Sequence, residues 1–268
     1  MNLPLLRYTF SANALRLVVI AAGLVLMGTI MPVMYAAFGQ EMQEFIESVP
    51  FFSQIASSFG GGDVMSLSGS LGVAFTHPFT LLLMGIMAIA FPALAIAGER
   101  DTGTLEVTLS RPISRRGLLA TLYFCGAVFI GLLLGVLVVT TGTVGFLVGF
   151  GDEIEYAHLL QLWLVDGLFF VAVMSLAFAV SVGADRAGPA IGIPAAVVLL
   201  SYLAWAIGGI WPDVKLLAAY SPFQLLKARQ VLEEGAALVD VAVLMGLIVL
   251  FAALAFYRFP RRDLPSPA

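Results

Sequence analysis

Six long apolar runs constrain this chain more than any other feature of its 268 residues. They cover approximately residues 15–38, 78–98, 118–149, 158–183, 189–211 and 238–258. A helix needs about 20 mostly apolar residues to cross a bilayer, and each run provides them. Barrel strands would alternate lipid-facing with polar residues, which these runs do not. The sequence therefore predicts an all-α polytopic membrane protein with six transmembrane helices.

The composition rules out an ordinary soluble domain. Hydrophobic residues make up 60% of the chain and charged residues 11%, against about 45–50% and about 25% in soluble proteins. The net charge of −4 gives no basic surface for nucleic acid. The first run is too long for the apolar core of a cleaved signal peptide, which is about 7–15 residues. We expect residues 1–268 to form one transmembrane domain.

The basic residues predict how the six spans are oriented. With both chain ends on one side, that side holds ten of the thirteen Lys and Arg residues: Arg7, Arg16, Arg100, Arg111, Arg115, Arg116, Arg186, Arg258, Arg261 and Arg262. The other side holds Lys215, Lys227 and Arg229. Basic residues near span ends remain in the cytoplasm. Both termini are therefore predicted to be cytoplasmic, in a multi-pass protein of the cytoplasmic membrane.

Two predicted outer segments have amphipathic patterns. In residues 39–77, glutamates recur every three residues among apolar side chains, which predicts a helix lying at the membrane interface. In residues 211–235, Ser221-Pro222 predicts a turn or helix start, followed by a short amphipathic helix. Connecting structure explains both segments, and a lid or substrate-entry element is the alternative for the first.

The sequence offers no catalytic, cofactor-binding or metal-binding constellation. Its two lysines, Lys215 and Lys227, do not follow a glycine-rich phosphate-binding loop. His77 and His158 have no cysteines or paired carboxylates at metal-ligand spacing. The single cysteine, Cys125, allows no intrachain disulfide. We expect the chain not to be an enzyme and to carry no ATPase site of its own.

Asp166 is the charged residue within a predicted span that most needs an explanation. It lies eight residues into the fourth run, and a carboxylate in mid-bilayer costs about 2.5–3.5 kcal/mol on insertion scales. Such groups usually face the bundle interior or water, and they often mark a transport path. Alternatively, the helix starts late and Asp166 lies near the outer headgroups beside Trp163. Both interpretations stay open from the sequence.

A charged segment separates the second and third runs, and we call residues 99–116 the charged loop. It holds four of the thirteen basic residues. Gly103-Thr104 would break the preceding helix, and Ser114 can cap the helix that begins at Arg115-Arg116. A short ordered element with exposed charges and a few apolar side chains suits docking into a groove on a soluble partner.

The charged loop resembles a segment of the ABC-2 type permeases, the membrane subunits of ATP-binding-cassette exporters. In that family the second span ends near Glu-Arg, and Gly-Thr-Leu-Glu, Leu-Ser and a Pro-x-Ser-Arg turn follow. The matching residues here are Glu99, Arg100, Gly103, Thr104, Leu105, Glu106, Leu109, Ser110, Pro112, Ser114 and Arg115. The six-span layout and the Tyr-Ser-Pro-Phe sequence at residues 220–223 also resemble members of the family.

This resemblance implies the permease subunit of an ATP-driven exporter. Such a half-transporter pairs with a second copy or a second permease, and it binds cytoplasmic ATPase subunits that hold ATP and Mg. The charged loop, Arg116 included, would be the coupling element that receives movement from the ATPase. The substrate path would follow apolar faces of the first, second and fifth spans. The alternative function is a membrane scaffold that docks a cytoplasmic partner without transport.

Overall fold

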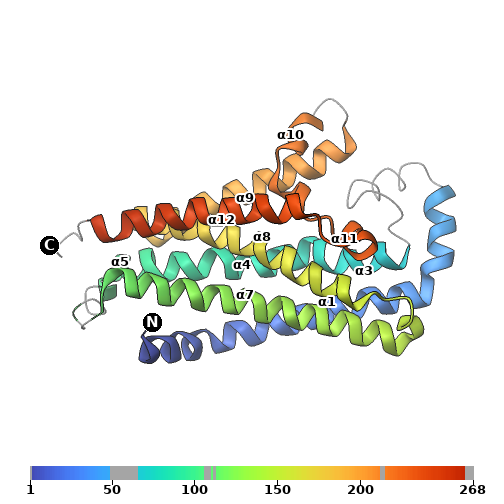
Figure 1. Cartoon of the computed structure of the whole chain (residues 1–268), viewed down its shortest axis with the longest axis horizontal. Coiled ribbons are helices and arrows are strands. Elements are labelled where there is room, and N and C mark those ends of the chain that lie inside the picture. The colour runs from blue at the N-terminus through green and yellow to red at the C-terminus, as the bar shows by residue number, and fades with distance from the viewer. Residues whose placement is uncertain (1, 49–65, 106–109, 111–112, 212–214, 263–268) are drawn as a thin grey trace.

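The computed structural model describes residues 2–48, 66–105, 110, 113–211 and 215–262. Within these ranges the chain forms helices and no strands. Six helical segments are long and apolar enough to cross a membrane: Leu3–Gly39, Leu67–Asp101, Arg115–Phe150, Tyr156–Gly183, Ala187–Gly208 and Leu238–Arg261. They run alongside one another as one elongated bundle (Figure 1). The six predicted spans are confirmed.

Several boundaries differ from the sequence prediction. Helix α1 (Leu3–Ser48) begins well before residue 15 and continues past residue 38. The second span begins with α3 (Leu67–Thr76) and continues, after the cap residue His77, into α4 (Pro78–Ala93). The last turns of α1 bend away from the bundle axis (Figure 1), whereas residues 67–77 belong to the second span. Residues 49–65 lie outside the described ranges.

Helix α8 (Tyr156–Gly183) lies at the centre of the bundle. It contacts α4, α7 (Arg115–Gly145), α9 (Ala187–Ile210) and α12 (Leu238–Arg258). In the most apolar 18-residue stretch of α8, 72% is buried inside the protein. The corresponding share is 17% for α9 and 11% for α12. The last two spans therefore lie at the periphery and leave most of their surface uncovered by the rest of the chain.

The indole of Trp163 packs over two glycines where α7 and α8 meet. The indole of Trp163 on α8 lies 3.6 Å from the position of a Cβ at Gly131 and 3.7 Å from that at Gly135. Its Nε1 donates a hydrogen bond of 2.8 Å to the carbonyl oxygen of Gly131. Small residues allow this approach in lipid, where helix association relies on packing and hydrogen bonds.

The end of α4 that leads into the charged loop is held in an unusual conformation. After Pro92, which has no N–H to donate, the chain forms a π-helix, η1 (Leu94–Gly98). The fully buried hydroxyl of Ser181 on α8 donates to the carbonyl oxygens of Pro92 (3.0 Å) and Ala93 (3.4 Å). It also accepts from the backbone N–H of Ala97 (3.2 Å). Ser181 therefore fixes the widened turn that leads into the charged loop.

Candidate functional site

The first half of the charged loop is a short, hydrogen-bonded turn. After α5 (Glu99–Asp101), the hydroxyls of Thr102 and Thr104 donate to the carbonyl oxygen of Glu99 at 3.3 and 3.2 Å. Gly103 has φ +73°, a left-handed conformation that glycine adopts without steric cost. The chain thus reverses immediately after the second span.

Leu105 anchors this turn inside the protein. Its side chain is 1% exposed and belongs to the main hydrophobic cluster. The sequence analysis treats it as part of a docking surface, whereas the structure places it in the core. Glu106, Leu109 and Pro112 lie outside the described residues.

The second half of the loop begins α7 as predicted. The Ser114 hydroxyl accepts a hydrogen bond of 3.1 Å from the Gly117 backbone N–H and so caps the helix. Ser114 and Arg116 are exposed, like Gly103 and Thr104 in the first half. Asp101, Thr102 and Ser110 are exposed as well, and these seven positions form the accessible surface of the described part of the loop.

Three arginines, which we call the arginine cluster, meet at the C-terminal end of α8: Arg100, Arg115 and Arg262. The last carbonyl groups of a helix lack intrahelical partners and carry partial negative charge. Arg100 Nη1 donates to the Ala184 carbonyl oxygen at 2.5 Å and lies 3.4 Å from that of Val182. Arg262 Nη1 donates to the Val182 oxygen at 2.7 Å.

The arginine cluster also connects the charged loop to the segment that follows α12. Arg115 Nη1 donates to the carbonyl oxygen of Arg262 at 2.6 Å and lies 3.4 Å from that of Pro260. Arg262 Nη2 forms an ion pair of 2.6 Å with Asp185 Oδ1 in the turn between α8 and α9. Sequence reasoning missed Arg262 and Asp185, because their contacts join residues far apart in the chain.

One carboxylate of the charged loop reaches the start of α9. Asp101 Oδ2 accepts a hydrogen bond of 3.3 Å from the Ala187 backbone N–H, the first residue of that helix. A negative charge is favourable there because the helix N-terminus is positive. The loop is therefore attached to the ends of α8 and α9 and to the chain after α12.

Both described chain ends lie beside the charged loop. The Asn2 backbone N–H donates to Thr121 Oγ1 of α7 at 3.3 Å, and Arg262 contacts Arg115. Figure 1 shows the first turns of α1, α5 and the last turns of α12 at the same end of the bundle. This shared end agrees with an even number of crossings, and its cytoplasmic location remains a prediction from charge.

An apolar groove of about 520 Å³ runs between α4 and α9. Its α4 side is formed by Pro78, Leu81, Leu82, Gly85, Ile86, Ile89 and Ala90. Its α9 side is formed by Ile191, Ala195, Val198, Leu199 and Tyr202, and Phe223 of η4 (Pro222–Leu225) completes the lining. A second cavity of about 60 Å³ between α8, α9 and α12 shares Val198 and Phe223 with the groove.

Comparison with known protein families shows to which family this chain belongs. Residues 11–264 match the family described as ABC-2 family transporter protein. The chain belongs to the ABC-2 family. As a member of this family, the protein is a membrane transport subunit with several membrane spans. Proteins of the family generally partner with cytoplasmic ATPase subunits. No curated protein matches the chain significantly.

At the opposite end, the ABC-2 chain carries a helical cap. Helix α11 (Ala228–Glu234) contacts both α3 and α8. A Cβ at Gly72 of α3 would lie 3.1 Å from the Arg229 backbone nitrogen, so the two backbones are close. His158 Nδ1 lies 2.9 Å from the Leu232 carbonyl oxygen, and Gln161 Oε1 accepts from the Ala236 N–H at 2.6 Å. The short helix predicted after Ser221-Pro222 is therefore present, although it starts at Ala228.

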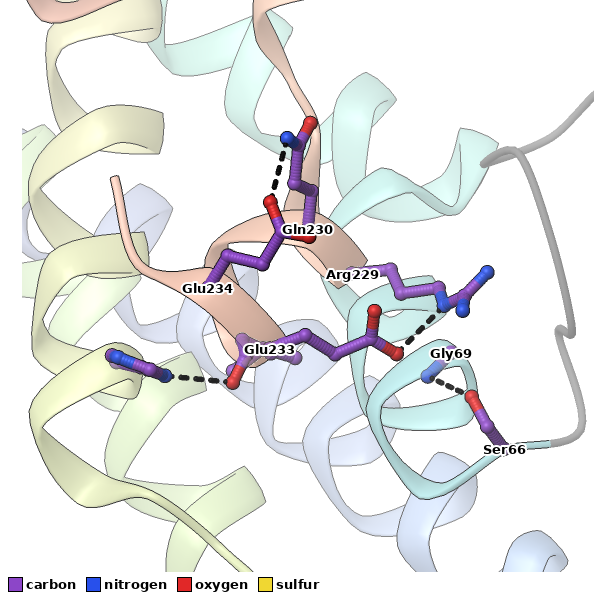
Figure 2. A network of polar contacts seen from close by, with 8 residues as sticks. Ser66, Gly69, Arg229, Gln230, Glu233 and Glu234 are labelled. Carbon is purple, nitrogen blue, oxygen red and sulfur yellow. Dashed lines mark hydrogen bonds and ion pairs between the residues drawn. The ribbon is translucent and has the colours of Figure 1, made fainter. Parts of the chain in front are cut away.

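Polar contacts stiffen α11 on its exposed side. Arg229 Nε and Glu233 Oε1 are 2.8 Å apart, and Gln230 Nε2 donates to Glu234 Oε2 at 3.0 Å. Figure 2 shows these two pairs on α11, each joining residues one turn apart, beside the Ser66 cap of α3. Each is an i to i+4 pair of the kind that adds about 0.2–0.5 kcal/mol to a helix. The cap owes its position to packing rather than to these pairs.

Asp166 lies inside the bundle of the ABC-2 chain. Its side chain is 1% exposed, and Oδ1 has no hydrogen-bond partner among the described residues. It lies ten residues, or about 15 Å, beyond the start of α8 at Tyr156. The helix therefore does not start late, and Asp166 lies inside the bundle, where it lines neither the groove nor the second cavity. Within the described ranges, no three His, Cys, Asp or Glu side chains are grouped to hold a metal ion.

Proposed function

We propose that this ABC-2 chain is the permease subunit of an ATP-driven exporter. Separate cytoplasmic ATPase subunits would bind ATP and Mg, and the charged loop would receive their movement. Two permease chains, identical or different, would form the complete transporter. The attachment of the loop to α8, α9 and the segment after α12 supports this proposal most directly.

The mechanical argument follows from those attachments. A force on the exposed residues Thr104 and Arg116 acts on a turn whose inner side is anchored by Leu105. Arg100 and Arg115 would transmit the displacement to the carbonyl end of α8 and to the chain after α12. Packed helix bundles respond to such shifts by moving between discrete arrangements.

The groove between α4 and α9 supports a path along the second and fifth spans. Its lining is apolar along its whole length, which favours an apolar or amphipathic cargo. Asp166 would reach such a path only after α8 separates from its neighbours. Asp166 would therefore line the substrate path only in an open arrangement of the bundle.

Co-purification tests the proposed partner. The tagged chain, extracted in mild detergent, is expected to carry a P-loop ATPase, identified by mass spectrometry. Arg116→Glu and Thr104→Arg alter exposed loop residues and should lower ATPase recovery at least about tenfold, a cost of about 1.4 kcal/mol in binding. Leu105 is unsuitable, because a charge at this buried site would unfold the loop.

Arg7→Glu is the matched control, because Arg7 is exposed near the described start of α1 at the same end of the bundle. It should leave ATPase recovery unchanged. Equal recovery with the loop variants would contradict the assignment of the charged loop. A wild-type chain that carries no ATPase would instead favour the scaffold function.

A further inference from the structure

We propose that the arginine cluster is a binding site for one anionic phosphate group, and that a phospholipid headgroup in the leaflet at this end of the bundle supplies it. Free phosphate is the other source of the same chemistry. The proposal rests on the charge of the cluster, on the donors that the cluster leaves unused and on its position at the span ends. It does not depend on the proposed function.

The arginine cluster concentrates positive charge at one point. Within the described ranges, Arg100 is repelled by the charges of Arg115 and Arg262 and attracted by that of Asp185. The carbonyl end of α8 contributes about half a negative charge. Counted over these four side chains and this helix end, a surplus of about 1.5 positive charges remains. Such a surplus favours the binding of an anion.

Two of the guanidinium groups approach the same oxygen. Arg100 Nη1 lies 3.4 Å and Arg262 Nη1 lies 2.7 Å from the Val182 carbonyl oxygen. These two nitrogens are therefore close neighbours, although both groups are cations. A phosphate group presents several charged oxygens and can bridge two guanidinium groups that one carbonyl oxygen joins only weakly.

Arg100 has donors without acceptors. Its Nε and Nη2 are buried and have no hydrogen-bond partner among the described residues. In the planar guanidinium fork, the edge formed by these two nitrogens fits two oxygens of one phosphate. A guanidinium group stays charged even when it is buried, and an uncompensated buried charge is costly. The unfilled edge of Arg100 therefore points to a missing anion.

Arg115 keeps the same edge uncommitted. Its hydrogen bonds within the described part of the chain use Nη1. Its Nε and Nη2 are not among the buried side-chain atoms that lack a partner, so they are accessible from outside the protein. An anion that approaches the cluster therefore meets the donors of Arg115 without any rearrangement.

Asp185 is the carboxylate on the outer side of the cluster. It pairs with Arg262 Nη2 at 2.6 Å, although its side chain is 69% exposed and that of Arg262 is 26% exposed. Exposed ion pairs contribute little stability, because water competes for both partners. A phosphate group can therefore displace Asp185 from Arg262, and it reaches the covered edge of Arg100 when the Arg262 side chain turns aside.

The position of the cluster favours a lipid as the source of the phosphate. Arg100 and Val182 lie one residue before the ends of the second and fourth spans, and Arg262 directly follows the sixth. Nearby, the Arg261 guanidinium carbon lies 3.9 Å from the centroid of the Tyr257 ring, and such aromatic residues are enriched at the level of the headgroups. Helix α12 leaves most of its surface uncovered, so a lipid can lie against it with its phosphate at the cluster.

The test measures lipid binding to the full chain by native mass spectrometry in a neutral detergent. The probes are phosphatidylglycerol and phosphatidylcholine with the same acyl chains. The first phosphatidylglycerol should bind to the wild type at least about fivefold tighter than the first phosphatidylcholine, because the cluster repels the choline cation.

Two substitutions change the affinity for phosphatidylglycerol in opposite directions. Arg262→Gln should weaken binding at least about tenfold, because it removes charge-assisted hydrogen bonds to the phosphate. Asp185→Asn should strengthen binding about two- to fivefold, because it removes a carboxylate that competes for Arg262 at little cost in stability. An ion pair with a structural role alone predicts no gain from Asp185→Asn, and this exposed substitution keeps the test valid if Arg262→Gln fails to fold.

Arg7→Gln is the matched control, because it makes the same change of charge at an exposed position in the first turns of α1, at the same end of the bundle. It should bind phosphatidylglycerol like the wild type. Melting temperatures without added lipid show that each variant is folded.

Inorganic phosphate separates the two sources. Sodium phosphate is compared with sodium chloride at equal ionic strength. If the headgroup is the ligand, sodium phosphate leaves phosphatidylglycerol bound. Displacement of the lipid by sodium phosphate, together with a rise in melting temperature that Arg262→Gln abolishes, would support the same site and assign it to free phosphate.

Three results would overturn the proposal. Equal affinity for phosphatidylglycerol in the wild type, Arg262→Gln and Asp185→Asn, with no effect of sodium phosphate, would show that the cluster binds no phosphate. An equal loss in Arg7→Gln would show attraction by overall charge rather than a site. Normal lipid binding by an Arg262→Gln variant that loses the co-purifying ATPase would show that a protein partner, and not a phosphate group, occupies the cluster.

Discussion

Ser181→Ala tests how the transition from α4 to the charged loop is stabilised. The substitution removes one hydroxyl that is 0% exposed. This hydroxyl donates one proton, shared between the Pro92 and Ala93 carbonyl oxygens, and accepts from the Ala97 N–H. The variant keeps the hydrocarbon packing and leaves the π-helical turn without its partner from α8.

The expected loss follows from these contacts. Two hydrogen bonds contribute a net of about 1 kcal/mol each in soluble proteins, and about 0.6 kcal/mol each on average between membrane helices. The Ala97 N–H is left buried without this acceptor, which costs about 1–3 kcal/mol when no other group replaces it. We therefore expect Ser181→Ala to lower the free energy of unfolding by about 1–3 kcal/mol.

Unfolding in mild detergent, followed by circular dichroism, measures this loss. Ser11→Ala is the control, because Ser11 is exposed and its hydroxyl bonds only within its own helix, to the Tyr8 carbonyl oxygen. The control should change stability by less than about 0.5 kcal/mol. Hydrogen exchange should also become faster at the Ala97 amide. A Ser181→Ala variant as stable as the control would refute the reasoning.

Three further substitutions separate competing contributions to stability. Asp166→Asn keeps the shape of the buried side chain and removes any charge, so the free energy of unfolding should stay level or rise by up to about 3 kcal/mol; a loss above about 1 kcal/mol in the same assay would show that the carboxylate has a partner. Arg262→Gln should cost about 1–2 kcal/mol through its bond to the Val182 carbonyl oxygen, whereas Asp185→Asn should cost less than about 0.5 kcal/mol, because Asp185 is 69% exposed. If Arg262→Gln and Asp185→Asn lowered the free energy of unfolding equally in this assay, the ion pair would contribute more than the contact with the Val182 carbonyl oxygen.

Features that depend on local sequence were predictable. Apolar run length gave the six spans, because the bilayer sets the length of a crossing. Ser114 was recognisable as a helix cap, and Ser221-Pro222 as a helix start, because the groups they contact lie within three residues. The ends of α1 were misplaced, because a helix can continue past the hydrocarbon core and bear charged residues at either end.

Features that depend on distant contacts were not predictable. In an apolar helix, the faces toward lipid, toward a neighbouring helix and toward a groove have the same composition. The groove between α4 and α9 was therefore not predictable from any pattern in the sequence. Leu105 alternates with polar residues, which fits an exposed or a buried position equally well. Arg262 contacts residues 80 and 147 positions away in sequence, and only the folded bundle brings these groups together.

The π-helix after Pro92 sets the phase between the groove and the charged loop. A π-turn holds about one more residue than an α-turn, and each residue of an α-helix turns the chain by about 100°. Residues beyond Gly98 therefore face a direction about 100° away from the one that a regular continuation of α4 would give them. If η1 became regular α-helix, the charged loop would turn by about this angle relative to the groove face of α4, so the π-helix at Leu94–Gly98 sets the direction in which the charged loop faces.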